Sequence, residues 1–354
     1  MHTDRKTLKP LKIGELTVEK PIIQGGMGVG VSRSNLAGAV AAEGGIGIIS
    51  TAQIGYDEEG FEKDQAGCNR IAIRKHIHRA KEIAEGKGLV GVNIMVALKH
   101  YKEHVQEAVL AGADVIISGA GLPMDLPKLV GNNKTKIAPI VSSRRAAQLI
   151  LKMWAHRYNR TADFIVIEGP KAGGHLGFHR EKLEIFTDET YAQEVKKILT
   201  VVREIEADSH KNIPVVLAGG IYDRADMDRA LALGVDGVQM GTRFVTTYEC
   251  DADLSYKQAY IDCKKEQIGI VKSPVGMPGR AIFNTFIKHG SHKIEKKCLH
   301  CLEHCNPKEI PYCITRALIA AAKGNLDEAL LFCGANAWKA EKLEHVADIM
   351  EELK

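Results

Sequence analysis

Residues 167–180 read IEGPKAGGHLGFHR and contain a candidate for acid–base chemistry, His175. Imidazole is the side chain whose unperturbed pKa lies nearest neutrality, so it can give or take a proton at physiological pH. Gly173, Gly174 and Gly177 surround it, and glycine lets a backbone approach a bound ligand closely. From spacing alone, the histidine could instead cap a backbone carbonyl of its own loop. The choice between these roles depends on what the neighbouring segments build.

Three other segments also pass from an apolar run into a cluster of small residues: 24–30 (QGGMGVG), 218–220 (AGG) and 239–243 (QMGTR). Glycine is common in tight turns, so each cluster can be explained by itself without a ligand. Together they predict backbone N–H groups gathered around a phosphate, with room for a flat ring beside it. Thr242 adds a hydroxyl donor. A phosphorylated planar cofactor fits this pattern, and FMN is the natural candidate.

Four of the eight cysteines crowd into sixteen residues, with the spacing C-x2-C-x3-C-x7-C. Four thiolates in so short a segment can hold zinc or an iron–sulfur cluster. The spacing matches neither the paired CxxC knuckles of a zinc ribbon nor the CxxCxxC run of bacterial ferredoxins. Two interpretations therefore stay open, a loop with free cysteines or a metal site made of Cys298, Cys301, Cys305 and Cys313.

Eight short apolar runs, each followed by a helical stretch, are spaced about thirty residues apart, the size of one βα unit. They are apolar nearly throughout, as strands buried on both faces are. One helical pattern begins at a plausible N-cap, Asp223, and ends at Gly234. Eight such units predict an α/β fold, a (β/α)8 TIM barrel, rather than a doubly wound sheet with fewer strands. The runs are residues 21–24, 46–50, 89–96, 114–118, 136–141, 163–169, 213–220 and 236–241.

The barrel core is expected to span residues 1–250, with ligands at the carboxyl ends of its strands. Long connections at 51–88 and 170–212 are candidates for lids and substrate walls. Residues 251–312 read as a smaller excursion that carries the cysteine cluster. Residues 313–354 are expected to close the barrel with two helices, at 313–323 and 335–353.

Composition excludes several other classes of protein. The 354 residues carry a formal net charge of +4, too mild to indicate binding to nucleic acid or to an anionic membrane. No apolar run approaches the ~20 residues of a membrane-spanning helix. The first ten residues, MHTDRKTLKP, lack the apolar core of a secretory signal. These features predict a cytoplasmic protein whose partner is a small-molecule substrate.

Several motifs resemble those of the nitronate monooxygenases, formerly called 2-nitropropane dioxygenases, and of the related FMN-dependent enoyl-acyl-carrier-protein reductases. They are PIIQGGMG, VGVNIM, EGPKAGGHLG, PVVLAGGI and GVDGVQMGTRF, followed beyond the barrel by SPVGMPGR and KGNLDEALLFCGANA. The resemblance covers nearly the whole chain and implies an FMN-binding barrel in which His175 is the active-site histidine. It implies cofactor contacts at Gln24, Gly25, Met27, Gly28, Asn93, Glu168, Gly173, Gly174, Ala218, Gly219, Gly220, Met240, Gly241 and Thr242.

The resemblance implies two redox activities. A nitronate monooxygenase oxidises an alkyl nitronate with O2 to a carbonyl compound and nitrite, with His175 orienting the nitronate or removing a proton from the nitroalkane. A reductase uses NADH or NADPH to reduce FMN, and then reduces an enoyl thioester or a quinone; an iron–sulfur centre would favour this activity. A phosphate-binding barrel without redox activity is a third alternative. Lys171 departs from the family, which often has an acidic residue there, and the family allows a homodimer.

Overall fold

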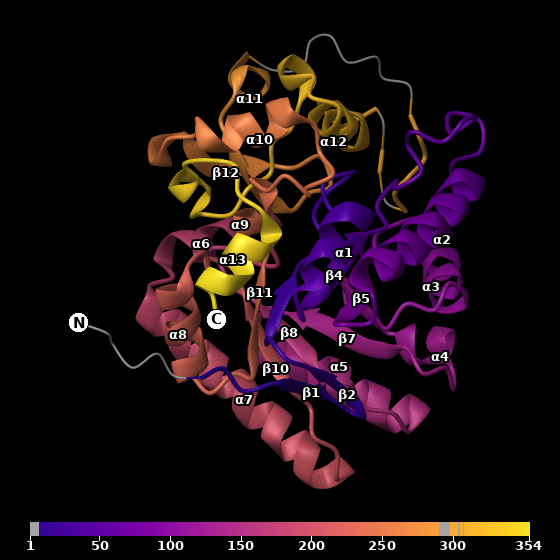
Figure 1. Ribbon diagram of the computed structural model, residues 1–354, viewed down its shortest axis with the longest axis vertical. Coiled ribbons are helices and arrows are strands. Elements are labelled where there is room, and N and C mark those ends of the chain that lie inside the picture. The colour runs from indigo at the N-terminus through magenta and orange to yellow at the C-terminus, as the bar shows by residue number, and fades with distance from the viewer. Residues whose placement is uncertain (1–6, 290–297, 304, 307) are drawn as a thin grey trace.

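Eight parallel strands form a closed barrel in the computed structural model, which describes residues 7–289, 298–303, 305–306 and 308–354 (Figure 1). Each predicted apolar run overlaps one barrel strand, so the (β/α)8 barrel is confirmed. The last strand pairs with the first, which closes the cylinder. Around the barrel the strands are β3 (Ile22–Gln24), β4 (Ile46–Ser50), β5 (Leu89–Met95), β6 (Val115–Gly119), β7 (Lys136–Val141), β8 (Ile165–Glu168), β10 (Val215–Ala218) and β11 (Gly237–Met240).

A hairpin of β1 (Leu11–Ile13) and β2 (Leu16–Val18) plugs the amino-terminal end of the barrel. Its apolar side chains alternate with exposed ones, and the inward-facing set is almost fully buried. Leu11 and Val18 pack into the same cluster as Ile23 and Ile48 of the barrel interior. Because this end is filled with side chains, a ligand can enter the barrel only at the carboxyl ends of the strands.

Helices surround the barrel, and α8 begins at the capping residue that the sequence predicts. The Asp223 carboxylate accepts the Asp226 N–H at 2.9 Å at the start of α8, and Gly234 lies beyond the end of that helix with φ 97°. The helices of the barrel and its loops are α1 (Ser34–Ala42), α2 (Gln65–Ala84), α3 (Tyr101–Leu110), α4 (Leu126–Val130), α5 (Arg144–Tyr158), α6 (Arg180–Ile185), α7 (Asp188–Ser209) and α8 (Arg224–Ala232).

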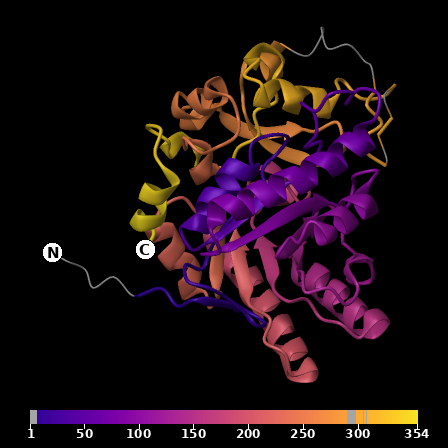
Figure 2. The same cartoon turned by 45° about the vertical axis from the view of Figure 1, so that its right-hand side comes forward.

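A second layer, here called the cap, lies over the carboxyl end of the barrel (Figures 1 and 2). It consists of α10 (Leu254–Ile261), β12 (Ile268–Lys272), β13 (Pro278–Ile282), α11 (Thr285–His289) and α12 (Ile314–Ala322), and it follows the short helix α9 (Thr242–Val245). The cap has its own apolar cluster, which includes Ala281, Phe286 and Leu330. Strand β13 pairs with β9 (Gly174–His175), so the cap is hydrogen-bonded to the loop that follows β8.

Of the two predicted closing helices, the one at 313–323 is present as α12 (Ile314–Ala322), whereas the one at 335–353 is not. Helix α12 belongs to the cap, where Ile314 joins the apolar cluster. Residues 335–353 are not one helix, but a 3-10 turn (Ala337–Lys339) and the short helix α13 (Val346–Glu352), which packs on α1. The prediction failed because side chains of this segment bind barrel loops: Lys339 contacts Asp223 at 2.8 Å, and the Glu344 carboxylate contacts Arg243.

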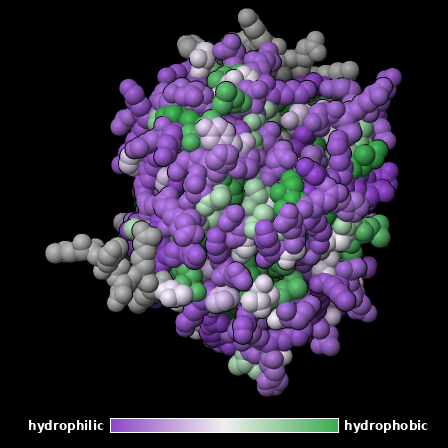
Figure 3. All heavy atoms as spheres, viewed as in Figure 1, coloured by the Kyte–Doolittle hydropathy of each residue, from purple (hydrophilic) through white to green (hydrophobic). Residues whose placement is uncertain are grey.

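None of the helices in the described part of the chain has both the length and the apolar character needed to cross a bilayer. The face drawn in Figure 3 is mostly hydrophilic, with small hydrophobic patches between charged side chains. The apolar side chains of the protein are therefore used chiefly in the barrel, in its helices and in the cap.

Candidate active site

The carboxyl ends of all eight barrel strands open into one cavity of about 430 Å3. Its size is ordinary for a cofactor or small-molecule site, for which about 300–1,000 Å3 is typical. The cap supplies the opposite wall, including Tyr256, Leu318 and Phe332. The structure brings fourteen of the fifteen predicted catalytic and cofactor-binding residues to this cavity: Gly25, Met27, Gly28, Asn93, Glu168, Gly173, Gly174, His175, Ala218, Gly219, Gly220, Met240, Gly241 and Thr242.

Gln24 is the one member of that set that lies outside the cavity wall. Its side chain is fully buried and bonds to the backbone of Ile48 in the neighbouring strand. The amide nitrogen donates to the Ile48 carbonyl at 3.2 Å, and the amide oxygen accepts the Ile48 N–H at 3.2 Å. Gln24 therefore joins β3 to β4. Its amide nitrogen also donates to the Gly25 carbonyl, so it has no hydrogen left to donate to a ligand.

The loops after β10 and β11 form the predicted glycine cradle. Gly219 and Gly220 have φ angles of 99° and 80°, a region that favours glycine, and their N–H groups bond to no acceptor in the described part of the chain. The Thr242 hydroxyl oxygen accepts the Gly334 N–H at 2.9 Å, which leaves the hydroxyl hydrogen free to donate. Free N–H groups beside a free hydroxyl donor suit a phosphate.

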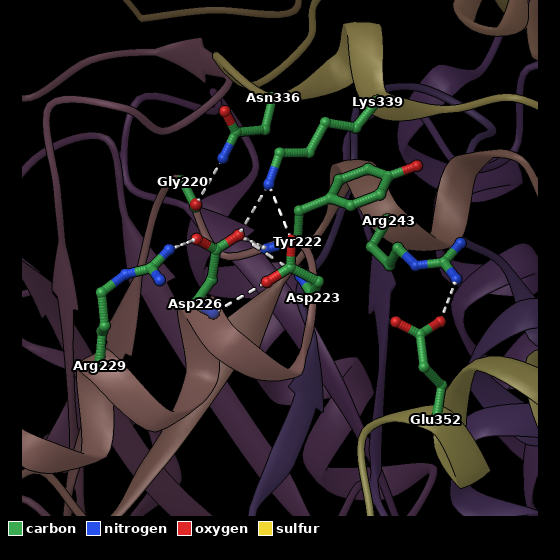
Figure 4. Close-up of polar contacts among 9 residues, drawn as sticks. All are labelled: Gly220, Tyr222, Asp223, Asp226, Arg229, Arg243, Asn336, Lys339 and Glu352. Carbon is green, nitrogen blue, oxygen red and sulfur yellow. Dashed lines mark hydrogen bonds and ion pairs between the residues drawn. The ribbon is translucent and has the colours of Figure 1, made fainter. Parts of the chain in front are cut away.

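Residues of the carboxyl-terminal segment brace this cradle from outside (Figure 4). Asn336 donates to the Gly220 carbonyl at 2.7 Å. The Tyr222 ring lies between two cations, with Arg243 5.1 Å and Lys339 5.7 Å from its centre. Arg243 also binds the Glu352 carboxylate of α13 at 2.7 Å. The cradle is thus held by contacts between segments more than a hundred residues apart in the chain.

On the opposite side of the cavity, the side-chain amides of Asn93 and Gln239 pack closely against two glycines. A Cβ atom on Gly26 would lie 2.4 Å from the Asn93 Cβ, and one on Gly25 would lie 3.0 Å from the Gln239 side chain, so neither position has space for a larger residue. The buried Gln239 amide oxygen has no hydrogen-bond partner among the described residues. Such an acceptor calls for an N–H donor from a ligand, as the pyrimidine ring of a flavin provides. The signal for Gln239 in the sequence is that it is the lone polar side chain of strand β11, GVQM.

His175 lies on β9 and is held by the cap. Its Nε2 shares a hydrogen bond of 2.8 Å with the Ser273 hydroxyl, and its ring packs edge-on against Phe332 with 5.0 Å between ring centres. Burial lowers the pKa of His175 to about 4, so the imidazole is neutral at pH 7. Sequence reasoning missed Ser273 and Phe332 because they approach His175 only through the cap, Ser273 from 98 residues away.

Glu168 ends β8 at the cavity wall and accepts a hydrogen bond from the Gly177 N–H, and among the described residues no cation lowers its pKa. Burial raises the pKa of Glu168 from its ordinary 4.5 to about 7, although the Gly177 N–H partly offsets this. The neighbouring Tyr191 hydroxyl is buried without a partner in the described part of the chain. Burial and then the Glu168 charge raise the pKa of Tyr191. The cavity therefore contains a carboxyl group that exchanges a proton near neutral pH.

The loop between β8 and β9 is pinned by two cationic side chains. Arg280 of the cap donates to the carbonyls of Pro170 at 2.8 Å and Ala172 at 2.6 Å. Lys171, which lies at the cavity, binds the Asp188 carboxylate at 2.5 Å at the start of α7. The charge of Lys171 is thus compensated within the protein.

The four clustered cysteines line a separate small cavity at the edge of the cap. All are free thiols. In the residues the structure describes, no three histidine, cysteine or acidic side chains are arranged to hold a metal ion, so the predicted metal site is not seen. Burial and then the nearby Cys313 thiol raise the pKa of Cys301 to about 11, with a partial offset from a hydrogen bond to Thr315.

Comparison with known proteins finds relatives by sequence and by structure. A probable nitronate monooxygenase of Staphylococcus aureus (strain Newman) is 28% identical over 298 residues, which cover 78% of this chain and 79% of that protein. FabK from Thermotoga maritima has a similar structure, with a TM-score of 0.71 and 26% identity, over 95% of this chain and 92% of that chain.

A third relative is the (3aS,4S,5R,7aS)-5-hydroxy-7a-methyl-1-oxo-octahydro-1H-indene-4-carboxyl-CoA dehydrogenase of Mycobacterium tuberculosis (strain ATCC 25618 / H37Rv). It is 27% identical over 265 residues, 75% of this chain but only 63% of that protein. The sequence profile described as nitronate monooxygenase matches residues 9–354. The protein is accordingly a flavin-dependent oxidoreductase. The chain belongs to the nitronate monooxygenase family.

Proposed function

We propose that this protein is an FMN-dependent nitronate monooxygenase, which oxidises alkyl nitronates with O2 to carbonyl compounds and nitrite. The observation that carries the proposal is a neutral imidazole, His175, fixed at the wall of a glycine-lined cavity. When bound, FMN supplies the electron transfer from the organic substrate to oxygen. The tasks left to the protein are to hold the cofactor, to orient the substrate and to limit access of water.

The residues present fit FMN at both ends of the cavity. The free N–H groups of Gly219 and Gly220 and the Thr242 hydroxyl would hold the phosphate. Asn93 and the unpartnered Gln239 amide oxygen would bond to the polar edge of the ring. Close packing at Gly25 and Gly26 leaves the wall flat there, as a planar ring system requires.

His175 is suited to orient an anionic substrate rather than to remove a proton. An imidazole with a pKa of about 4 is a weak base, so it would abstract a proton from a neutral nitroalkane inefficiently. When Ser273 donates to Nε2, the proton of the imidazole sits on Nδ1 and can be donated to an oxygen of the nitronate. The substrate is therefore expected to enter as the nitronate.

An NAD(P)H-dependent reductase of enoyl thioesters or quinones is the second candidate. It is supported by the likeness to FabK and by a relative whose name specifies a carboxyl-CoA substrate, which is a thioester. The cap wall favours an acyl chain as well, since Met277, Leu318 and Phe332 make it apolar. In this reaction a hydrogen-bond donor such as His175 would bind the thioester carbonyl.

Anaerobic stopped-flow spectroscopy of the purified flavoprotein distinguishes the candidates, with an alkyl nitronate, NADH and NADPH offered separately. Bleaching of the flavin by the nitronate, followed by nitrite release when O2 is admitted, is the expected result. Bleaching by a nicotinamide alone would replace the proposal with the reductase. His175→Ala should keep its FMN but lose reduction by nitronate, and normal reduction in this variant would contradict the role assigned to His175.

A further inference from the structure

Four cysteines of the cap edge, Cys298, Cys301, Cys305 and Cys313, meet around one enclosed space. Its volume is about 20 Å3, and apolar side chains supply the rest of its lining. The four residues come from a loop and from the N-cap of α12, so their convergence is a result of folding and not only of their proximity in sequence. None of the four is joined in a disulfide.

The sulfur atoms have hydrogen-bond donors beside them. The His300 N–H donates to the Cys298 sulfur at 3.2 Å, and the Thr315 hydroxyl lies 3.0 Å from the Cys301 sulfur. Donors of this kind stabilise thiolate ligands and tune the metal that they bind. Four free cysteines in a surface loop would need neither these hydrogen-bond donors nor a shared apolar cavity.

The segment is also docked firmly on the barrel. The Lys99 N–H donates to the Cys301 carbonyl at 3.2 Å, and the Glu303 N–H donates to the Ala97 carbonyl at 3.2 Å. Leu299 and Cys301 pack with Phe61 in a small apolar cluster. The connection after β5 and the connection after β4 therefore both hold the cysteine segment in place.

We propose that Cys298, Cys301, Cys305 and Cys313 together bind one thiophilic metal centre, either an iron–sulfur cluster or a zinc ion, through four thiolates. The four cysteines line the same small cavity, and four thiolates are the ligand set of a zinc site or of an iron–sulfur cluster. This site is separate from the flavin cavity and does not depend on the proposed reaction.

The two centres differ in the spacing that they require of the four sulfurs. Zinc binds thiolates at about 2.3 Å, so its ligands must draw together, because no three of them hold a single ion as they are described. A cluster tolerates wider spacing because its cysteines bind different irons, so it asks for less rearrangement of the four thiols than a zinc ion does. Cys298 and Cys305 are only partly buried.

The proposed centre would lie beside the active-site cavity. Cys313 directly precedes α12, and Leu318 on the same helix lines the flavin cavity. Five residues of helix correspond to about 7.5 Å along its axis. Binding of a metal would therefore fix the start of the helix that forms part of the cavity wall.

The test is metal and acid-labile sulfide analysis of the full-length flavoprotein, purified without oxygen and without chelator. Iron with matching sulfide, or zinc without sulfide, bound in proportion to chain would support the proposal and identify the centre. Absence of both metals, together with failure to take up zinc or to be reconstituted with iron and sulfide, would overturn it.

Single variants establish which thiols are ligands. Cys298→Ser and Cys305→Ser replace partly buried residues, so the fold should survive, but bound metal should fall by about tenfold or more. Cys263→Ser is the matched control, because Cys263 is buried outside the small cavity and should keep its metal. Circular dichroism and flavin content report folding. Equal metal in all three variants would refute the ligand assignment.

Discussion

Replacing Glu168 with glutamine tests whether the cavity holds a carboxyl group that titrates near neutrality. The folded protein raises the pKa of Glu168 from 4.5 to about 7 by burial, which the hydrogen bond from the Gly177 N–H only partly offsets. Glutamine has nearly the same shape and can accept the same Gly177 N–H, but it never ionises. The variant therefore removes the titration and keeps the packing.

The expected magnitude follows from proton linkage. Between pH 4.5 and 7 the folded state retains the Glu168 proton and the unfolded state has lost it, so the free energy of unfolding decreases as pH rises. At 1.36 kcal/mol per pH unit, the difference between 4.5 and 7 amounts to about 3 kcal/mol. Above pH 7 both states are ionised and the loss stays constant. Relative to the wild type, Glu168→Gln should gain about 3 kcal/mol of stability between pH 4.5 and 8.

The assay is urea unfolding of flavin-free wild type and variant at a series of pH values from 4.5 to 8. Subtracting the two curves removes the opposite effect of the buried histidines, whose lowered pKa values act equally in both proteins. Glu204→Gln, on the exposed face of α7, is the control for replacing a glutamate by an amide outside the cavity. If the stability difference between Glu168→Gln and wild type did not change with pH, the Glu168 carboxyl would be ionised across the range and the reasoning would be wrong.

Substitutions at three further positions test the cradle and the residues that support His175. Gly241 has an ordinary backbone conformation, and a Cβ atom there would lie 3.3 Å from the flexible Met27 sulfur, so Gly241→Ala should still bind FMN. Gly241→Val should fold but bind FMN about 10- to 100-fold more weakly, because overpacking costs ~1–3 kcal/mol. Equal FMN affinity of both variants in a fluorescence titration would show that the phosphate binds elsewhere. Ser273→Ala removes a hydrogen bond worth about 1 kcal/mol, and kcat should fall about fivefold with full FMN content; an unchanged kcat would show that Ser273 does not orient the imidazole. Arg280→Ala removes two bonds to the loop before His175 and should lower the free energy of unfolding by about 2–3 kcal/mol in urea; a loss below 1 kcal/mol would refute the pinning.

The barrel could be predicted because each strand is buried on both faces, so its apolar run can be recognised without reference to the rest of the chain. The glycine cradle could be recognised for a similar local reason. At Gly219 and Gly220 the backbone has positive φ, which leaves little choice of residue. Gln24 shows the limit of this reasoning. Its motif lies at a strand end, but the direction in which a side chain points there is decided by the neighbouring strand, where the backbone of Ile48 binds it.

The cap was not predictable in the same way because its short strands and helices gain their stability from one another. Strand β9 contains only Gly174 and His175, too few residues to show any periodicity, and it forms because β13 pairs with it. The helix predicted at 335–353 does not form, because contacts of its side chains with the barrel, such as Lys339 with Asp223, replace helical hydrogen bonding. Both cases require partners that lie far away in sequence, which no local pattern records.

This division between barrel and cap bears on which reaction the protein performs. The barrel side of the cavity supplies the features that any bound FMN would need, including the cradle at Gly219 and the amide of Gln239. The residues that would act on the organic substrate depend on the cap, because Ser273 and Phe332 hold the imidazole of His175. A change in the cap can therefore alter substrate preference without loss of the cofactor. It follows that Ser273→Ala should change kcat for nitronate while the absorbance spectrum of the bound flavin stays the same, and a shifted flavin spectrum would mean that cap and cofactor site are not separable.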